Sequence, residues 1–188
     1  MTIVEGKRDT MYDRLKQVES EIVQINYEHW LHYELFTWQW WLLVVLSVVP
    51  WILWWRVVDK RRIIEILAVG LFVATIASLQ DVYGWNRGMW RYPIQLLPVC
   101  IPLLPFDVSV LPIVQMFVYQ FFRSWKAFLG VNLVIAFSFA YISEPLLEWM
   151  GIYDPIKWKH IYSVPIYVMN AVVAKWGIEK LKKIESRA

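Results

Sequence analysis

The sequence contains little cysteine, histidine and glycine, and these shortages exclude several classes of site. A single cysteine, Cys100, cannot form an intrachain disulfide. The few glycines form no phosphate-binding loop, and neither a CxxC pair nor an HExxH zinc helix is present. Ser138 and Ser143 lack the flanking glycines of a hydrolase nucleophile. These absences favour a non-enzymatic protein without a cofactor or a metal site.

A secretory signal and a strong net charge are also missing. The first apolar run begins only near Trp38, and no small-residue cleavage site follows it. The 19 basic and 16 acidic residues leave a net charge of +3. The basic residues cluster at the ends of apolar segments, which is typical of membrane topology signals and not of a nucleic-acid-binding surface.

Hydrophobic and aromatic residues are abundant instead. Of the 188 residues, 59% are hydrophobic, against about 45–50% in a soluble globular domain. Mean hydropathy is +0.41, and tryptophan alone occurs 13 times. Tryptophan and tyrosine gather at membrane–water interfaces, so this composition predicts an all-α, polytopic helical bundle in a lipid bilayer.

Residues 1–37 form a first segment, which is polar and has helical periodicity. Apolar side chains recur in it at spacings of 4, 3, 4 and 3, at Met11, Leu15, Val18, Ile22 and Ile25. We expect an N-terminal amphipathic helix. It either lies on the membrane or on its own membrane domain, or it pairs with a second copy or a membrane partner.

Residues 38–176 form the membrane domain, and residues 177–188 form a basic C-terminal tail. We expect five spans, one of them broken by prolines, at residues 38–55, 63–80, 93–122, 127–150 and 161–176. Basic residues concentrate in 56–62, in 123–126 and in the tail, and are fewer in the alternate loops. Since basic loops remain inside, this bias predicts an N-terminus outside and a C-terminus in the cytoplasm.

The third segment combines prolines with a carboxylate. Pro105 suits the first turn of a helix, and a helix from Phe106 to Phe122 would be about 25 Å long. Pro112 would bend this helix, and Pro93, Pro98 and Pro102 leave the preceding stretch unwound. Such a backbone persists at membrane depth only when it is buried in protein or lines a water-filled cavity.

Five charged residues reach a similar depth near the outer boundary in this arrangement: Asp81, Arg87, Arg91, Asp107 and Glu144. They either pair and fix the outer loops or line an outward-facing polar pocket, as ionisable groups inside membranes often do. We expect Asp107 to pair with Arg91 or Arg87. His160, in the loop "KWKH", has no obvious partner.

Several uncharged polar residues are further lining candidates, and each is also suited to an interhelical hydrogen bond. They are Gln80, Gln95, Gln115, Asn132, Tyr141, Tyr153 and Tyr162.

Five short motifs resemble a family of small multi-span proteins of spore-forming Gram-positive bacteria. They are D-x6-G-x-W-x-Y-P at 81–93, PFD at 105–107, YQFFRSWK at 119–126, EP at 144–145 and YSVPIY at 162–167. The resemblance covers roughly residues 55–170 and implies a bacterial plasma membrane. That family has no established activity from which residue roles could be transferred.

A second resemblance is to the membrane lycopene cyclases, whose helices carry a proline followed by paired acidic residues. In LPFD at 104–107, one acid follows Phe106 and the second is missing.

Three functions remain open on the sequence. The first is non-enzymatic binding, transport or lipid handling through the outward-facing pocket. The second is a structural or interaction subunit of a membrane complex. The third is a membrane enzyme that acts on an apolar, isoprenoid-like substrate.

Overall fold

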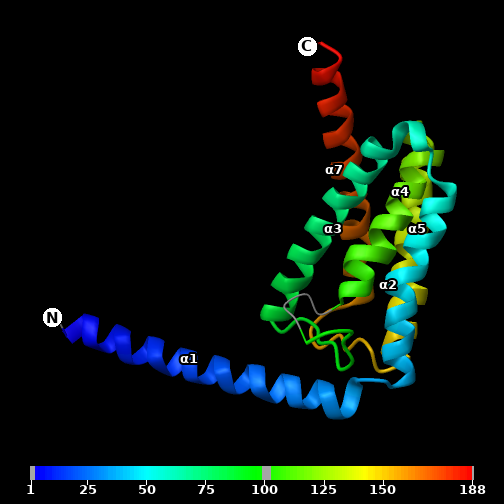
Figure 1. Ribbon diagram of the computed structural model, residues 1–188. Helices are drawn as coiled ribbons and strands as arrows, with labels where there is room; N and C mark the ends of the chain where they lie inside the picture. The colour runs from blue at the N-terminus through cyan, green and yellow to red at the C-terminus, as the bar shows by residue number, and fades with distance from the viewer. Residues whose placement is uncertain (1–2, 99–102, 188) are drawn as a thin grey trace.

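The computed structural model describes residues 3–98 and 103–187, so Cys100 and Pro102 lie outside the described residues. Every regular element in these two ranges is a helix, which confirms the all-α class. Figure 1 shows an upright bundle of helices, with the long helix α1 projecting sideways from one end. The C-terminus lies at the opposite end of the bundle.

The N-terminal part consists of α1 (Ile3–His29), a π-helical turn (Trp30–Glu34) and α2 (Trp38–Val57). Phe36, with φ 62°, lies where the chain turns between the π-helical turn and α2. The Thr37 side chain caps α2 by accepting a hydrogen bond from the Trp40 backbone N–H. The apolar side chains of the α1 heptad seam are exposed from Met11 to Ile25.

The central part begins with a 3-10 turn (Lys60–Arg62) that leads into α3 (Ile63–Asn86). Residues 87–98 form an irregular segment after α3, and a π-helical turn (Phe106–Val110) continues directly into α4 (Leu111–Phe121). The expected helix from Phe106 to Phe122 is therefore present, with an unwound stretch before it.

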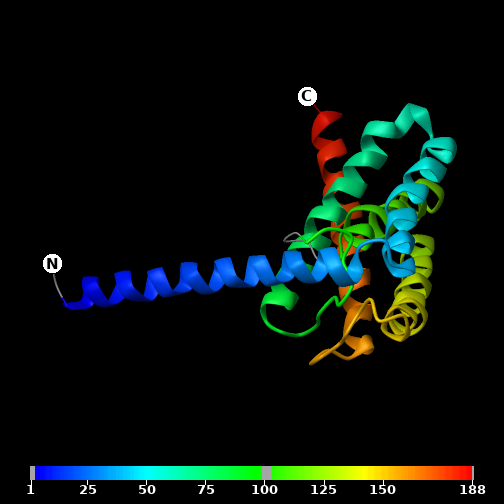
Figure 2. The ribbon, with the colours of Figure 1, turned by 60° about the horizontal axis from the view of Figure 1, so that its bottom comes forward.

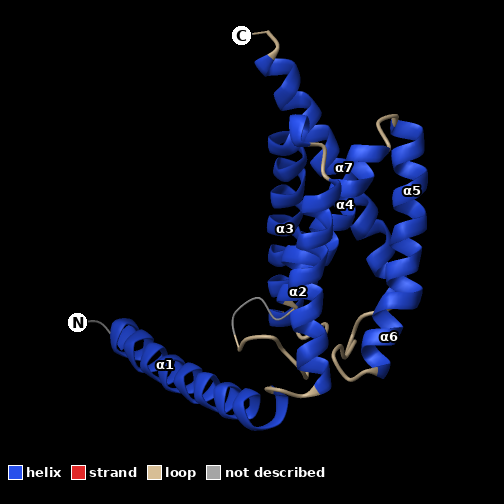
Figure 3. Ribbon diagram, turned by 45° about the vertical axis from the view of Figure 1, so that its right-hand side comes forward, coloured by secondary structure: helices blue, strands red, loops and turns tan. Residues whose placement is uncertain are grey.

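The C-terminal part contains two long helical segments. Helix α5 (Trp125–Ser138), a π-helical turn (Phe139–Ser143) and α6 (Glu144–Trp149) follow one another without a break (Figure 3). Helix α7 (His160–Glu185) passes through Pro165 and includes most of residues 177–188. The basic tail thus continues the last helix.

Four helical segments in the described residues are long and apolar enough to cross a membrane: Trp38–Val57, Lys60–Asn86, Trp125–Trp149 and His160–Glu185. The apolar helix Phe106–Phe121 is shorter, at about 24 Å for its 16 positions. Helices α2, α3, α4, α5 and α7 run alternately in opposite directions along the bundle (Figures 1 and 2). The five crossings expected from the sequence stay a prediction.

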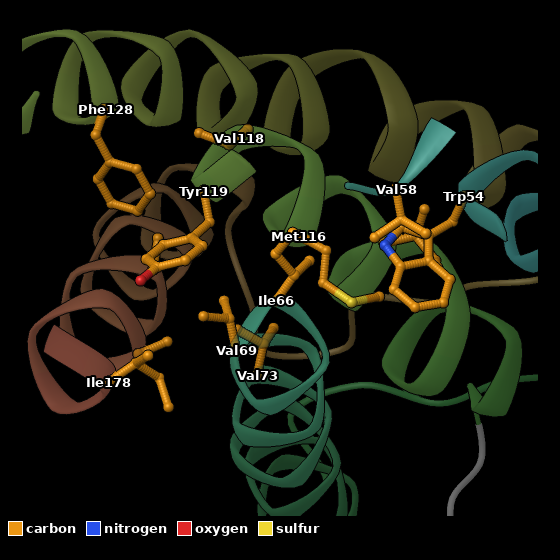
Figure 4. Close-up of a cluster of buried hydrophobic side chains, with 13 residues drawn as sticks. Trp54, Val58, Ile66, Val69, Val73, Met116, Val118, Tyr119, Phe128 and Ile178 are labelled. Atoms are coloured by element: carbon orange, nitrogen blue, oxygen red, sulfur yellow. The ribbon is translucent and has the colours of Figure 1, made fainter. Parts of the chain in front are cut away.

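The main hydrophobic core lies between α2, α3, α4, α5 and α7, as Figure 4 shows for a cluster around Met116 and Ile66. Met116 is fully buried and lies against Gly70 of α3. A Cβ at position 70 would lie 2.6 Å from the Met116 sulfur, so glycine permits this close approach of α3 and α4.

Charged residues concentrate at the end of the bundle away from α1. Glu65 accepts hydrogen bonds from Arg62 and Tyr119 and lies 2.8 Å from the Lys182 ammonium group. Lys175 is 1% exposed and donates to the carbonyls of Phe122 and Arg123, which follow α4. A cation beside the last carbonyls of a helix is favoured by the helix dipole, so Lys175 fixes α7 against α4.

Candidate functional site

Two prolines shape the helices that carry Asp107 and Glu144. Pro112 has no N–H to donate to the carbonyl of residue 108, and Pro145 has none for residue 141. A π-helical turn lies at each of these positions, at Phe106–Val110 and Phe139–Ser143. Such turns are frequent at functional sites because they redirect the neighbouring side chains. Asp107 and Glu144 are both buried.

A cavity of about 120 Å³ lies between these turns, α3, α7 and the irregular segment after α3. We call it the acidic cavity, because Asp81, Asp107 and Glu144 all line it. Most of its remaining lining is apolar or aromatic, and the aromatic residues are Trp90, Tyr92, Phe106, Phe139, Tyr153, Trp158 and Tyr167. Its lining includes Glu144 and Leu147 of α6, a helix at the end of the bundle from which α1 projects (Figure 3).

Asp81, near the end of α3, is held by two side chains of the following segment. Its Oδ1 atom accepts a hydrogen bond of 2.8 Å from Trp90 Nε1 and one of 2.5 Å from the Tyr92 hydroxyl. Gly88, with φ +63°, allows the chain to turn back toward α3. The Trp90 ring then lies over Gly84, where a Cβ would come within 2.0 Å of it.

Asp107 faces Asp81 across the cavity wall. The two carboxyl groups are close enough to interact electrostatically, and we call them the acidic pair. The Oδ2 atoms of both residues are buried and receive no hydrogen bond from residues 3–98 and 103–187. A hydrogen bond between two carboxyl groups requires a proton on one of them, since two adjacent carboxylates repel.

Glu144 has partners of its own. Its carboxylate accepts a hydrogen bond of 2.8 Å from the Tyr167 hydroxyl and lies 2.8 Å from His160 Nδ1. The other ring nitrogen of His160 lies 3.3 Å from the Glu148 carboxylate, so the imidazole bridges two acids. This contact supplies the partner for His160 that the sequence did not reveal.

An amide pair joins α3 to α7 beside the cavity. Gln80 and Asn170 exchange two hydrogen bonds, of 3.0 and 2.7 Å, between their side-chain amides. Trp158 Nε1 donates to Ser163 Oγ over 2.9 Å, and the Trp158 ring packs edge-on against Trp90. Among the described residues that line the cavity, only the two acids of the acidic pair have buried side-chain oxygen atoms that receive no hydrogen bond.

Two tyrosines of the connecting segments remain protonated in this environment. Burial raises the pKa of the Tyr92 phenol, and the negative charge of Asp81 raises it further. Burial also raises the pKa of Tyr153, and the charge of Glu144 acts in the same direction. Tyr92 therefore acts as a hydrogen-bond donor to Asp81 over a wide pH range.

The expected ion pair between Asp107 and Arg91 or Arg87 is wrong. Both arginines are exposed, and neither lines the acidic cavity. The backbones of Arg91 and Asp154 pair with each other, and the Arg91 guanidinium donates to the Trp85 carbonyl at the end of α3. The negative end of the α3 dipole, rather than a carboxylate, attracts this cation.

The other polar residues named from the sequence have separate positions. Gln80 and Tyr153 line the acidic cavity, whereas Tyr141 and Tyr162 are exposed. Gln115 donates to Asn132 across α4 and α5. The Gln95 backbone N–H donates to the buried Glu34 carboxylate, which fixes the irregular segment to the turn after α1.

Sequence reasoning missed Trp90, Tyr92 and Trp158 as site residues. Trp90 and Tyr92 belong to the motif D-x6-G-x-W-x-Y-P, so the spacing of its aromatic residues from Asp81 was the available signal. In the described residues, no three His, Cys, Asp or Glu side chains are arranged to hold a metal ion. No family model, curated protein or solved structure matches the chain.

Proposed function

We propose that this protein is an integral membrane protein that binds a small ligand, or the polar end of a lipid, in the acidic cavity without converting it chemically. The observation that carries the proposal is the acidic pair. Asp81 and Asp107 are 6% and 5% exposed, and each has one carboxyl oxygen that receives no hydrogen bond from the described residues. Buried polar atoms are normally satisfied, so unpaired acceptors in a cavity wall suit a ligand or water.

The motif residues support this assignment. The motifs that resemble the bacterial multi-span family include Asp81, Trp90, Tyr92, Asp107 and Glu144, and all five line the acidic cavity. They come from three separate parts of the chain. We therefore propose that the family resemblance reflects a common binding site, and that the protein resides in a bacterial plasma membrane.

The proposed topology has five crossings, with the N-terminus outside and the cytoplasmic C-terminus at the end of α7. The basic residues of 56–62, 123–126 and the tail support this orientation. The acidic cavity then opens toward the outer face. The short helix Phe106–Phe121 makes the third crossing, and the irregular residues 87–98 lie on its outer side.

Cysteine labelling tests this topology, because Cys100 is the only cysteine to remove. In a Cys100→Ser background, a membrane-impermeant maleimide should label Asp154→Cys in intact cells and spare Arg61→Cys. Both positions are exposed, so the difference reports sidedness. Labelling of Arg61→Cys in intact cells would overturn the orientation.

Native mass spectrometry tests the binding function. The protein extracted from its own membrane should carry a bound small molecule or lipid. Leu111→Trp should lose it, because the larger side chain fills the cavity that Leu111 lines. Leu133→Trp, on an exposed face of α5, is the control and should retain the ligand. Equal ligand content in all three proteins would refute a function in the acidic cavity.

A second function is supported by α1. Five apolar side chains form its seam, and all are exposed along a helix that projects from the bundle (Figure 1): Met11, Leu15, Val18, Ile22 and Ile25. We propose that this helix recruits a second copy or a membrane partner. Light scattering should show a smaller assembly for Leu15→Glu/Ile22→Glu than for the unchanged protein, and an unchanged mass would refute self-association.

A further inference from the structure

The acidic cavity has free hydrogen-bond acceptors at one specific point. These are the Oδ2 atoms of Asp81 and Asp107, on side chains that are more than nine-tenths buried. The other carboxyl group of the lining, Glu144, is already engaged by Tyr167 and His160. An occupant that satisfies this wall must therefore bring hydrogen-bond donors or positive charge to the acidic pair.

The charge of the lining restricts the occupant further. Among the described residues that line the cavity, three carry carboxyl groups and none is lysine, arginine or histidine. An anion placed there would face like charge without a counter-ion, and a purely apolar occupant would leave the acidic pair unsatisfied. A cation is the occupant that this charge distribution favours.

The aromatic content of the lining separates organic from inorganic cations. Seven of the lining residues are aromatic, among them Trp90, Phe139 and Trp158. Aromatic faces attract a desolvated organic cation, and such cages bind quaternary ammonium groups. A hard metal ion needs several oxygen ligands, and no group of three suitable side chains exists in the described ranges 3–98 and 103–187.

We infer that the acidic cavity binds an organic ammonium ion, with its positive charge at Asp81 and Asp107 and its alkyl groups against the aromatic wall. This inference rests on the proposed binding function and names the ligand class for the same cavity. A free amine and the ammonium head group of a lipid share this chemistry.

A matched set of three probes isolates the contribution of charge. Choline carries a quaternary ammonium group, 3,3-dimethylbutan-1-ol replaces its nitrogen by carbon, and 3,3-dimethylbutanoate has a similar shape with a negative charge. Calorimetric titration of the full-length protein in detergent should give choline an affinity at least about tenfold above that of the alcohol. The carboxylate should not bind. Phosphatidylcholine vesicles added as competitor distinguish the two sources. They should displace choline if the cavity prefers a lipid head group and leave choline bound if it prefers a free amine.

Two variants locate the charge-dependent contact. Asp107→Asn keeps the shape of the side chain and removes its charge, so choline should bind about tenfold more weakly while the alcohol is unaffected. Phe139→Leu keeps the apolar character and removes the ring, and should weaken choline alone by about threefold. Asp154→Asn, an exposed carboxylate at the same end of the bundle, should leave all three affinities unchanged.

The outcomes separate this inference from the proposed function. Equal binding of choline and the alcohol, lost in Leu111→Trp, would refute the ammonium preference and leave a ligand-binding cavity in place. Absence of binding by all three probes, together with no copurified ligand, would refute both. Tighter binding of the carboxylate would overturn the charge argument directly. Because the comparison of probes uses the unchanged protein, a variant that does not fold leaves the test intact.

Discussion

The indole of Trp90 donates a hydrogen bond of 2.8 Å to Asp81, although nine residues separate them in sequence. Gly84 makes this contact possible, because the Trp90 ring occupies the space that a side chain at position 84 would need. Asp81 is thereby fixed in the wall of the acidic cavity with its Oδ1 atom engaged. Its Oδ2 atom is buried and receives no hydrogen bond from the part of the chain that the structure describes.

Gly84→Ala should destabilise the protein by about 1–3 kcal/mol, as overpacking of a buried contact does. The added methyl group would lie 2.0 Å from the Trp90 ring, which Asp81 and Trp158 hold in place. Gly130→Ala is the control, since no atom lies within 4 Å of its added methyl group. Thermal melting in detergent measures both. Equal melting temperatures of the two variants would contradict the close packing.

Tyr92→Phe should lower stability by about 1–3 kcal/mol at neutral pH, because Asp81 loses a buried donor. The variant should also change the alkaline behaviour. The pKa of Tyr92 is raised in the folded protein, while an unfolded tyrosine ionises near pH ~10. The folded state therefore retains this proton, and the stability linked to it is present below that pH and is lost as the pH rises above it.

Melting temperatures between about pH 8 and 11 measure this difference. The unchanged protein should lose stability more steeply than Tyr92→Phe over that window. Tyr162→Phe, whose side chain is exposed, should follow the unchanged protein. Parallel curves for all three proteins would show that Tyr92 ionises normally.

Asp107→Asn and Asp107→Ala should differ in stability. The asparagine amide can donate a hydrogen bond to Asp81 and removes the repulsion between two adjacent carboxylates, so we expect stability within about 1 kcal/mol of the unchanged protein. Alanine supplies no donor to Asp81 Oδ2 and leaves an empty space beside it, so this variant should be less stable than Asp107→Asn by about 1–3 kcal/mol. The same loss for both variants would argue against contact within the acidic pair.

A double-mutant cycle with Arg91 tests whether Asp107 has an arginine partner. Because its guanidinium donates to backbone carbonyls and not to Asp107, the effects of Arg91→Ala and Asp107→Ala should add. If the double variant loses markedly less stability than the sum of the two single losses, Arg91 and Asp107 do interact as an ion pair.

The amide pair between α3 and α7 should be coupled energetically. Gln80 and Asn170 exchange two hydrogen bonds in the apolar part of the bundle. A double-mutant cycle with Gln80→Leu and Asn170→Leu should give an interaction energy of about 0.6–1.7 kcal/mol, the range for interhelical hydrogen bonds in membranes. Unfolding in mixed micelles provides the four free energies. Additive effects would mean that lipid or water replaces the contact without loss.

The sequence by itself determined the helical class and the approximate position of each helix. Inside a bilayer the backbone must make its hydrogen bonds within the chain, so apolar runs bounded by tryptophan and basic residues form long helices. Helices α2, α5 with α6, and α7 lie at the expected places. Pro105 likewise located the start of the helix at Phe106, because proline is favoured in the first turn, where its missing N–H costs no hydrogen bond.

Only the tertiary structure decided the chemistry of the site. Counting residues along helices places Asp81 and Asp107 at one depth, but depth does not tell which side chains face each other. The sequence suggested an arginine beside Asp107, whereas rotation of the helices and the turn at Gly88 bring Asp81, Trp90 and Tyr92 there instead. Opposite charge predicts attraction between any acid and base within reach, so side-chain direction, which depends on packing, determines the partner.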